Sequence, residues 1–518
     1  MTFGRAAISA ALVFLAFSFT SALAQDVAFT SRDGSIEVEG TLLGFDGEFY
    51  RVSTVYGELT LDASGVLCDG PGCPNLDDFV ARLRISGAAS MGDVLMPALI
   101  QAFAARNGLR ATKVPQDETR YTYEIADETR VVGLFEFHST NTEEGFADLL
   151  ADESDMVMAT REVRSEESRR AKTAGFGDLQ DVNRSRVVAL DGLVAVVAPG
   201  HPVRALSTDQ LSRIFAGEID NWSELGGPDA PIELHLPAGA TGFAQAIEDK
   251  LMRPARRALS EDILRHDSPS SVAAAVSRDF LGIGVSTYSA IGNAMPIMLR
   301  GSCGFELRAS RRSIKTEDYP LTAPLFLYLP MRRLPQLARE FLVYTRTAPA
   351  QIVIRRAGFV DQAPEEIPLD QQGNRFANAI AVAGEELPLT ELQQMVADLR
   401  PRARLSTSFR FEAGSARLDA QSRSNVQQFA RALETGQYDA RDILFVGFSD
   451  GQGPAQINQT IAARRAEAVK SAVVAAAEAA DFDRLTLSSE AYGEALPMAC
   501  DDTPWGRGVN RRVEVWVR

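Results

Sequence analysis

The stretch from residue 445 to residue 469 constrains the fold of this chain more than any other. An apolar run ends there at Asp450, and a short segment with two glycines and Pro454 follows. Glycine and proline interrupt a strand, and proline is tolerated in the first turn of a helix. The sequence therefore predicts a strand, a turn and then a helix.

The predicted helix carries an arginine in the middle of its apolar face. Seven residues share an arc of about 140° at 100° per residue. They are Asn458, Ile461, Ala462, Arg465, Ala466, Val469 and Val473. A guanidinium facing the core needs an anionic partner, because an unpaired buried charge is costly. Asp450, on the loop before the helix, is the nearest candidate in sequence.

Two interpretations of Asp450 and Arg465 are open. In the first, they form a structural ion pair that steadies the loop. In the second, Asp450 binds an ammonium group and Arg465 binds a carboxylate, so that the ligand is zwitterionic.

The segment 403–518 resembles the peptidoglycan-binding OmpA C-terminal family, which has an α+β fold. The matching features are the strand 405–411, the Asp-x-x-Gly turn 450–453, Asn458, the Arg465-Ala466 pair and the closing segments 506–507 and 510–514. In that family an Asp and an Arg hold the diaminopimelate of the stem peptide. The resemblance therefore implies Asp450 and Arg465 as the binding residues, with Asn458 and Arg511 in support. The chain departs from the family at Ser449, where Thr is usual, and at Ala462, where Ser is usual.

Residues 1–24 have the pattern of a secretory signal peptide. Arg5 precedes the apolar run 6–19, and Ala22-Leu23-Ala24 fits a cleavage site before Gln25. The run is too short for a spanning helix, and no later stretch of eighteen apolar residues follows. We expect a periplasmic protein without a transmembrane segment, and the length predicts about three domains.

The charge and the cysteines limit the partners and cofactors. A formal net charge of −16 makes nucleic acid an unsuitable partner. Four cysteines in an exported chain are compatible with two disulfides. Cys68 and Cys73 flank a turn that could close a local bridge, and a Cys303–Cys500 bridge would tie the middle of the chain to its C-terminal domain. The four histidines are scattered without metal-site spacing, so we expect no metal and no cofactor.

Residues 25–80 are expected to form a small β-rich module. Four short β-type runs are separated by glycine-containing turns, at 27–30, 35–43, 48–53 and 58–61. A meander or open barrel of this size has a small core, which the first cysteine pair would support. The simplest interpretation is a docking or spacer module.

Strand-type and helix-type runs alternate from residue 84 to residue 360, which is typical of βαβ units and a parallel sheet. Small and hydroxyl residues precede three of the predicted helices, at 87–93, 137–142 and 237–242. Such helix starts leave backbone N–H groups free to hold an anion, although each alone could be an ordinary N-cap. Together they indicate a cleft for a small anion.

This region resembles the phosphate-type (PstS-like) periplasmic substrate-binding proteins, in which two lobes of a type II periplasmic-binding-protein fold close on an oxyanion. The resemblance covers about 84–359 and rests on segments 155–161, 191–197, 206–217, 221–227 and 282–286. It implies oxyanion-binding residues at the three helix starts and a carboxylate that accepts the ligand's proton. These residues are Ser90, Met91, Ser139, Thr140, Asp155, Gly239, Ala240 and Thr241. The chain departs from this family in the third loop, where His235 stands near the position of an Arg and one hydroxyl is missing. Losing one cation and one hydroxyl would cost roughly a few kcal/mol of charge-assisted hydrogen bonding to the ligand.

Residues 361–402 are expected to form a linker that is loop-like at 363–368 and 371–374 and contains a short amphipathic helix at 389–399. The whole chain is thus expected to be an α/β multidomain protein.

The predicted function is that of a non-enzymatic periplasmic protein that binds a phosphate-like oxyanion and is anchored noncovalently to peptidoglycan. The sequence has no nucleophile elbow, P-loop, His-Glu-x-x-His motif or nucleotide fingerprint. One alternative is an envelope interaction protein whose lobed domain no longer binds a ligand. The other is a phosphatase-like enzyme, with Asp155 and His235 as an acid–base pair across the cleft.

Overall fold

The computed structural model describes residues 26–518 except 77, 182, 240, 385, 386, 413, 414 and 416. The expected signal peptide, residues 1–24, lies outside the described residues. The chain divides into two compact units, one ending at Phe79 and the other beginning at Val80. Within the described ranges, none of the helices combines the length and apolarity that a membrane span requires.

The first unit is a single antiparallel sheet with the order β4-β3-β2-β1-β5. Its strands are β1 (Asp26–Ser31), β2 (Glu37–Phe45), β3 (Phe49–Thr54), β4 (Gly57–Asp62) and β5 (Val66–Asp69). The first four form the expected meander, and β5 is an additional strand that pairs with β1. The core is small, with Phe29 and Tyr50 at its centre, and a disulfide joins Cys68 in β5 to Cys73.

An eleven-stranded sheet forms the centre of the second unit, with the order β14-β13-β15-β11-β19-β10-β6-β9-β8-β7 and with β16 paired to β11. Its strands are β6 (Ala81–Ala88), β7 (Arg110–Pro115), β8 (Arg120–Ala126), β9 (Val131–Thr140), β10 (Met156–Ala159), β11 (Ser185–Val197), β13 (Glu233–Pro237), β14 (Ile263–His266), β15 (Gly282–Thr287), β16 (Met295–Pro296) and β19 (Thr322–Tyr328). A small sheet contains β12 (Ala205–Leu206), β17 (Met298–Arg300) and β18 (Glu306–Leu307).

The large sheet is mixed, so the expectation of a parallel sheet is wrong. β19 runs antiparallel to both of its neighbours, β10 and β11, whereas β6 is parallel to β9 and β10. The sequence did not reveal this, because a strand that is buried on both faces is a continuous apolar run whichever way it points.

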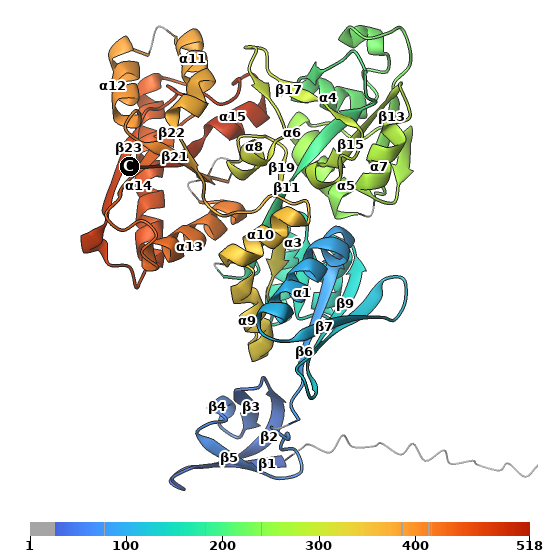
Figure 1. Ribbon diagram of the computed structural model, residues 1–518, viewed down its shortest axis with the longest axis vertical. Coiled ribbons are helices and arrows are strands. Elements are labelled where there is room, and N and C mark those ends of the chain that lie inside the picture. The colour runs from blue at the N-terminus through green and yellow to red at the C-terminus, as the bar shows by residue number, and fades with distance from the viewer. Residues whose placement is uncertain are drawn as a thin grey trace, which may run out of the picture. The chain divides into compact units, whose positions relative to one another are not determined.

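The long strand β11 connects two lobes. Its first half pairs with β19 and its second half pairs with β15, and the buried residues form two separate core clusters. In Figure 1, β11 and β19 lie between the blue lobe with α1 and β9 and the green lobe with α5 and α7. The helices of this region are α1 (Met96–Arg106), α2 (Thr142–Leu150), α3 (Ser165–Thr173), α4 (Thr208–Phe215), α5 (Gly242–Ile247), α6 (Arg253–Ala255), α7 (Pro269–Val276), α8 (Arg311–Lys315), α9 (Gln336–Tyr344) and α10 (Ala348–Arg356).

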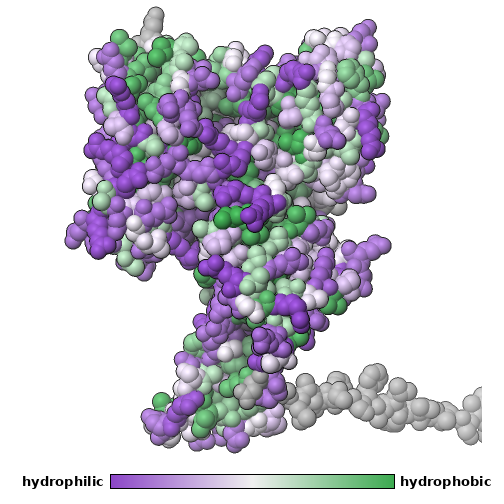
Figure 2. Space-filling view, in the orientation of Figure 1, coloured by the Kyte–Doolittle hydropathy of each residue, from purple (hydrophilic) through white to green (hydrophobic). Residues whose placement is uncertain are grey.

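The C-terminal region is a five-stranded sheet covered by helices, with the order β20-β21-β24-β22-β23. Its strands are β20 (Glu366–Ile367), β21 (Ala403–Arg410), β22 (Asp442–Phe448), β23 (Thr486–Ala491) and β24 (Arg512–Val517). Its helices are α11 (Gly373–Val382), α12 (Leu389–Leu399), α13 (Ala420–Glu434), α14 (Ala455–Ala476) and α15 (Pro504–Asn510). On the face shown in Figure 2, hydrophilic side chains cover most of this region.

The helices α11 and α12 pack on this sheet. Ala379, Met395 and Leu399 join Leu444 and Trp516 in one buried cluster. The reading of 371–374 as a loop is therefore wrong, since these residues belong to a 3-10 turn and the start of α11. The polar residues at the start of α11 resemble a loop in the sequence, but burial of the apolar side of this helix against the sheet stabilises it.

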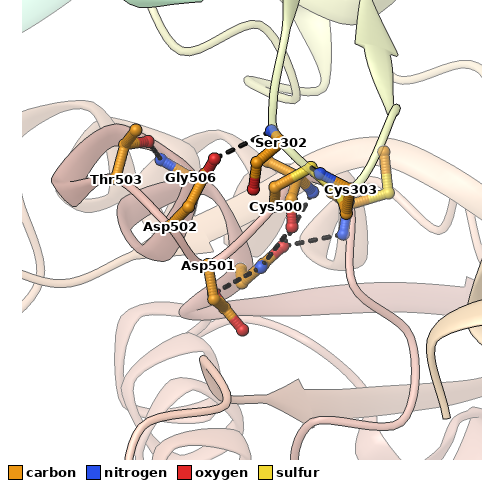
Figure 3. The surroundings of a disulfide bond; sticks show 10 residues. Ser302, Cys303, Cys500, Asp501, Asp502, Thr503 and Gly506 are labelled. Carbon is orange, nitrogen blue, oxygen red and sulfur yellow. Dashed lines mark hydrogen bonds between the residues drawn. A yellow bond between two sulfur atoms is a disulfide. The ribbon is translucent and has the colours of Figure 1, made fainter. Parts of the chain in front are cut away.

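A disulfide joins the lobed region to the C-terminal region. Cys303 and Cys500 are bonded, with 5.6 Å between their Cα atoms, as the sequence suggested. Figure 3 shows the backbone N–H of Ser302 donating to Asp502 beside this bond, at 2.8 Å. On α15, the indole N–H of Trp505 donates to the carbonyl of Lys250 at 2.6 Å.

Buried charges connect the same two regions. Asp318, which follows α8, accepts two hydrogen bonds from the guanidinium of Arg404 on β21, at 2.7 and 3.0 Å. Glu514 on β24 pairs with Arg404, Arg375 and Arg512. All five side chains are largely or fully buried. Because each carboxylate faces at least one guanidinium, these charges hold the two regions in one arrangement.

Glu317, next to this network, makes stability depend on pH. Burial, followed by the charge of Asp419, raises the pKa of Glu317 from 4.5 to about 8. Between these values the folded protein keeps a proton that the unfolded chain releases, so stability falls as pH rises from about 4.5 to 8. We expect Glu317→Gln, which is uncharged at every pH, to flatten this decline by a few kcal/mol at about 1.4 kcal/mol per pH unit.

Urea unfolding of both proteins at pH 5 and pH 8 measures this difference. An equal loss of stability between the two pH values in wild type and Glu317→Gln would contradict the assignment.

Candidate functional site

A cleft of about 380 Å³ lies between the two lobes. Its lining comes from the carboxyl ends of the strands: Ser90 follows β6, Thr140 ends β9, Thr160 follows β10, Thr241 follows β13 and Asp267 follows β14. Crevices at the carboxyl ends of strands in an open α/β sheet are where such folds bind ligands. The structure therefore brings the three predicted helix starts together.

Two hydroxyl groups in the cleft are buried without a hydrogen-bond partner among the described residues. They are the Oγ of Ser90 and the Oγ1 of Thr140, and both residues line the cleft. Buried polar atoms nearly always have a partner, so each of these hydroxyls is available to a polar ligand.

The other predicted residues of this site are placed less favourably. Met91 is fully buried, and Gly239 is not among the described residues that line the cleft. Ser139 donates its hydroxyl to Asp93 at 2.8 Å, and Asp93 does line the cleft. Ala240 lies outside the described residues.

Asp93 and Asp267 are the charged residues among the described lining of the cleft, which contains no Lys or Arg. Positive potential comes instead from helix starts. The helix α2 is capped by Asn141 and α7 by Ser268, and both caps line the cleft. A helix N-terminus carries about half a positive charge, which favours an anion.

Asp155 is not part of the cleft, which corrects the sequence-based assignment. It precedes β10 and so lies at the opposite end of this strand from Thr160. There it accepts hydrogen bonds from Arg84 at 2.7 Å and from Arg332 at 3.0 Å.

The suggested acid–base pair of Asp155 and His235 is also wrong. The imidazole of His235 contacts Asp279 and His266, each at 3.0 Å. His235 does not line the cleft either. Each of the two side chains is thus engaged with other partners, away from any ligand in the cleft.

A second candidate site lies where β22 leads into α14. Asp450 accepts a hydrogen bond from Arg511 at 2.6 Å, and both side chains keep contact with solvent, at 13% and 29% exposure. The sequence proposed Arg465 as the partner of Asp450, and the structure places Arg511 there. Asp450 and Arg511 are far apart in sequence, which explains why local spacing did not find this pair.

Arg465 remains without an ion pair or hydrogen bond among the described residues. Its guanidinium is half-buried and stacks over the ring of Phe411, 5.1 Å from the ring centre. Burial lowers the pKa of Arg465, the charge of Arg511 lowers it further, and Asp450 opposes both. A partly desolvated cation beside an acid is therefore available to an anionic group.

The apolar face of α14 is narrower than predicted. Asn458, Ala462, Ala466, Val469 and Val473 are buried, whereas Ile461 is 37% exposed and Arg465 lies at the edge of the buried face. That position allows Arg465 to reach solvent.

Two acidic residues near this site were missed by the sequence analysis. The amide of Asn458 donates to Glu494 at 2.7 Å, and Asp501 accepts from the backbone N–H of Gly451 at 2.7 Å. Burial raises the pKa of Asp501. Both acids come from loops that return to the site, and nothing in the local sequence pattern marks them.

Fold and cleft together define a two-lobed binding protein, and the chain belongs to the PBP superfamily. The family model described as "PBP superfamily domain" matches residues 80–346, just over half of the chain. A second model, "OmpA family", matches residues 410–511, so the chain also carries an OmpA domain.

Among curated relatives, the "Phosphate-binding protein PstS" of Staphylococcus haemolyticus is 26% identical over 212 residues, covering 39% of this chain and 64% of the relative. That of Bacillus subtilis is 25% identical over 191 residues, covering 36% and 61%. The chain thus spans less than two thirds of either relative. "Outer membrane porin F" of Pseudomonas fluorescens is 38% identical over 81 residues, covering 16% of this chain and 24% of the relative.

Among solved structures, a putative phosphate ABC transporter substrate-binding protein with bound phosphate, from Clostridium perfringens, is 20% identical with a TM-score of 0.43. It covers 54% of this chain and 99% of its own. The peptidoglycan-associated lipoprotein of Burkholderia pseudomallei is 24% identical with a TM-score of 0.19, covering 21% and 89%.

The two family matches support ligand binding and association with the cell envelope.

Proposed function

We propose that this protein is a non-enzymatic periplasmic binding protein for a small phosphate-like oxyanion, held at peptidoglycan by its C-terminal domain. The main support for oxyanion binding is that the hydroxyls of Ser90 and Thr140 are buried in the cleft and have no partner in the part of the chain that the structure describes. Residues 1–24 would be the signal peptide, 25–80 a docking or spacer module and 84–360 the binding domain. Residues 361–402 would be a connector whose helices α11 and α12 pack on the wall-binding domain, 403–518.

The cleft would take the oxyanion in a protonated, singly charged form. A dianion would face Asp93 and Asp267 with no basic side chain among the described lining residues. A protonated oxyanion can instead donate its O–H to a carboxylate while accepting from hydroxyls and helix N-termini. Asp93 would thus have the role that the sequence gave to Asp155.

The wall site would bind the zwitterionic end of a diaminopimelate side chain. Asp450 would hold the ammonium group, and the unpaired guanidinium of Arg465 would hold the carboxylate. Arg511 would share Asp450 with the ligand, and Asn458, fixed by Glu494, would keep the loop before α14 in place.

The double variant Ser90→Ala/Thr140→Val tests the cleft. Each lost hydrogen bond to an anion costs about 1.5–3 kcal/mol, so we expect the affinity of the cleft for inorganic phosphate to fall more than about 100-fold. Wild-type affinity should increase as the pH falls and phosphate becomes singly charged. Titration calorimetry measures both effects, with Thr173→Val, an exposed hydroxyl, as the matched control.

Other outcomes would favour the alternatives. No heat and no thermal shift with phosphate, sulfate or small organic acids would favour an envelope interaction protein without a small ligand. Turnover of a chromogenic phosphate ester would instead indicate an enzyme. That result would contradict the proposed binding role, which agrees with the name "Phosphate-binding protein" of the PstS relatives.

A further inference from the structure

Three arginines lie on segments that pack together where the lobed region contacts the C-terminal domain, and glutamine side chains join these segments by hydrogen bonds. Arg186 lies on β11, Arg346 follows α9, and Arg431 lies on α13. We refer to them as the arginine cluster. Two of its members thus belong to the lobed region and one to the C-terminal domain, and none lines the cleft.

The cluster has no counter-charge among the described residues. None of the three guanidiniums forms an ion pair or a hydrogen bond there, and the Nη1 of Arg186 and the Nε of Arg346 are buried without any partner. Arg404, which also connects the two regions, differs, because it is held by two carboxylates. Since unpaired buried charge is costly, the bare cluster is an unfavourable arrangement that a bound anion would relieve.

The charges of the cluster act on one another. Burial, followed by the charge of Arg431, lowers the pKa of Arg186 to about 10. Burial, followed by Arg186 and Arg431, lowers the pKa of Arg346 to about 9. Both side chains remain charged at neutral pH, and the charge of Arg431 acts on each of them.

Packing between the two regions fixes the cluster. The helix α13 contacts β11. Gln428, one turn before Arg431, donates to the side-chain oxygen of Gln362 at 3.0 Å. The amide of Gln362 donates in turn to the carbonyl of Val187, the neighbour of Arg186, at 2.8 Å. The arginines are therefore presented by a hydrogen-bonded frame.

The cluster remains open to a ligand. Arg431 is exposed, and Arg186 and Arg346 each have only one nitrogen that is buried and unpaired. Their other guanidinium nitrogens stay accessible and free to donate. Guanidinium forks match the geometry of phosphate oxygens and can bind them in pairs.

We propose that the arginine cluster is a second anion site, which binds a multivalent oxyanion such as inorganic phosphate in its doubly charged form. This site is separate from the cleft and has the opposite electrostatic character, with three cations and no carboxylate partner among the residues that the structure describes. Its ligand contacts both regions of the second unit, so binding stabilises their contact.

The test uses the full chain carrying Ser90→Ala/Thr140→Val, so that the cleft does not contribute. Thermal unfolding is followed with increasing inorganic phosphate, against chloride at equal ionic strength. A ligand that binds only the folded state raises stability by RT ln(1 + [L]/Kd), so phosphate should raise Tm and chloride should not. Arg186→Gln and Arg346→Gln should weaken the apparent phosphate affinity about tenfold or more.

Stability measured in chloride without phosphate distinguishes an anion-binding arginine from a structural one. If the arginines repel one another, Arg186→Gln should be at least as stable as its parent in chloride, because one positive charge is gone. If Arg186 is merely structural, its replacement should lower the stability of the protein. Arg464→Gln removes an exposed charge on α14 and should keep the full phosphate effect. If the buried variants fail to fold, Arg431→Gln at the exposed position should still weaken the phosphate effect several-fold.

Equal Tm shifts with phosphate and chloride, or an undiminished phosphate effect in Arg186→Gln and Arg431→Gln, would overturn the proposal. Calorimetric stoichiometry separates the two sites. We expect two phosphates per wild-type chain and one after either the cleft or the cluster is disabled.

Discussion

Replacing Arg465 by alanine is expected to lower retention of the protein on purified peptidoglycan sacculi at least about tenfold. The guanidinium has no partner among the described residues and lies beside Asp450, so its removal deletes the cation that would hold a ligand carboxylate. A charge-assisted hydrogen bond contributes about 1.5–3 kcal/mol, which corresponds to this loss or a larger one. Asp450→Ala should have a similar effect, because the ammonium group loses its acceptor.

The adjacent Arg464 provides a matched control. It lies on the same helix and is exposed, so Arg464→Ala removes the same charge without touching the site. Co-sedimentation with sacculi should show wild-type retention for Arg464→Ala. Full retention of both Arg465→Ala and Asp450→Ala would count against this site.

Replacing Arg404 by alanine is expected to reduce the free energy of unfolding by about 3–5 kcal/mol, the usual cost of leaving a buried charge without its partner. Arg404 is 2% exposed, donates twice to Asp318 and lies 3.3 Å from Glu514. Its removal would leave Asp318 with Arg410, at 3.6 Å, as its remaining ion pair within the described ranges. Because Asp318 and Arg404 belong to different regions, the contact between these regions should loosen first.

Urea unfolding measures this loss of free energy, and two probes, one in the lobed region and one in the C-terminal region, show whether the contact between them loosens first. Arg169→Ala, which removes an exposed arginine paired with Glu166, should cost less than about 1 kcal/mol. A cost below 1 kcal/mol for Arg404→Ala as well would show that the buried pair adds little to the contact between the regions.

Local patterns predicted much of the fold. The turns of the first unit, the strand–turn–helix at 445–469 and the helix starts around Ser90, Thr140 and Thr241 all depend on residues close together in sequence. Glycine, proline and hydroxyl side chains act on the backbone within a few positions, so their effects can be recognised without a structure.

Features that depend on distant segments could not be predicted. Arg511 reaches Asp450 because β24 pairs with β22. Asp155 binds Arg84 because it precedes β10, at the end of this strand that is far from the cleft. The arginine cluster likewise combines β11, α13 and the end of α9. No local periodicity specifies which of many charged side chains will meet, since sheet order and direction decide it.

One chain is proposed to bind phosphate in its cleft and peptidoglycan through its C-terminal domain. Sedimentation of labelled inorganic phosphate with sacculi-bound protein tests this most directly. Wild type and Ser90→Ala/Thr140→Val are mixed with purified sacculi near pH 6 and sedimented. We expect both proteins in the pellet, with more bound phosphate per chain in wild type than in the double variant. Equal phosphate in the two pellets, or protein that remains in the supernatant, would contradict the account.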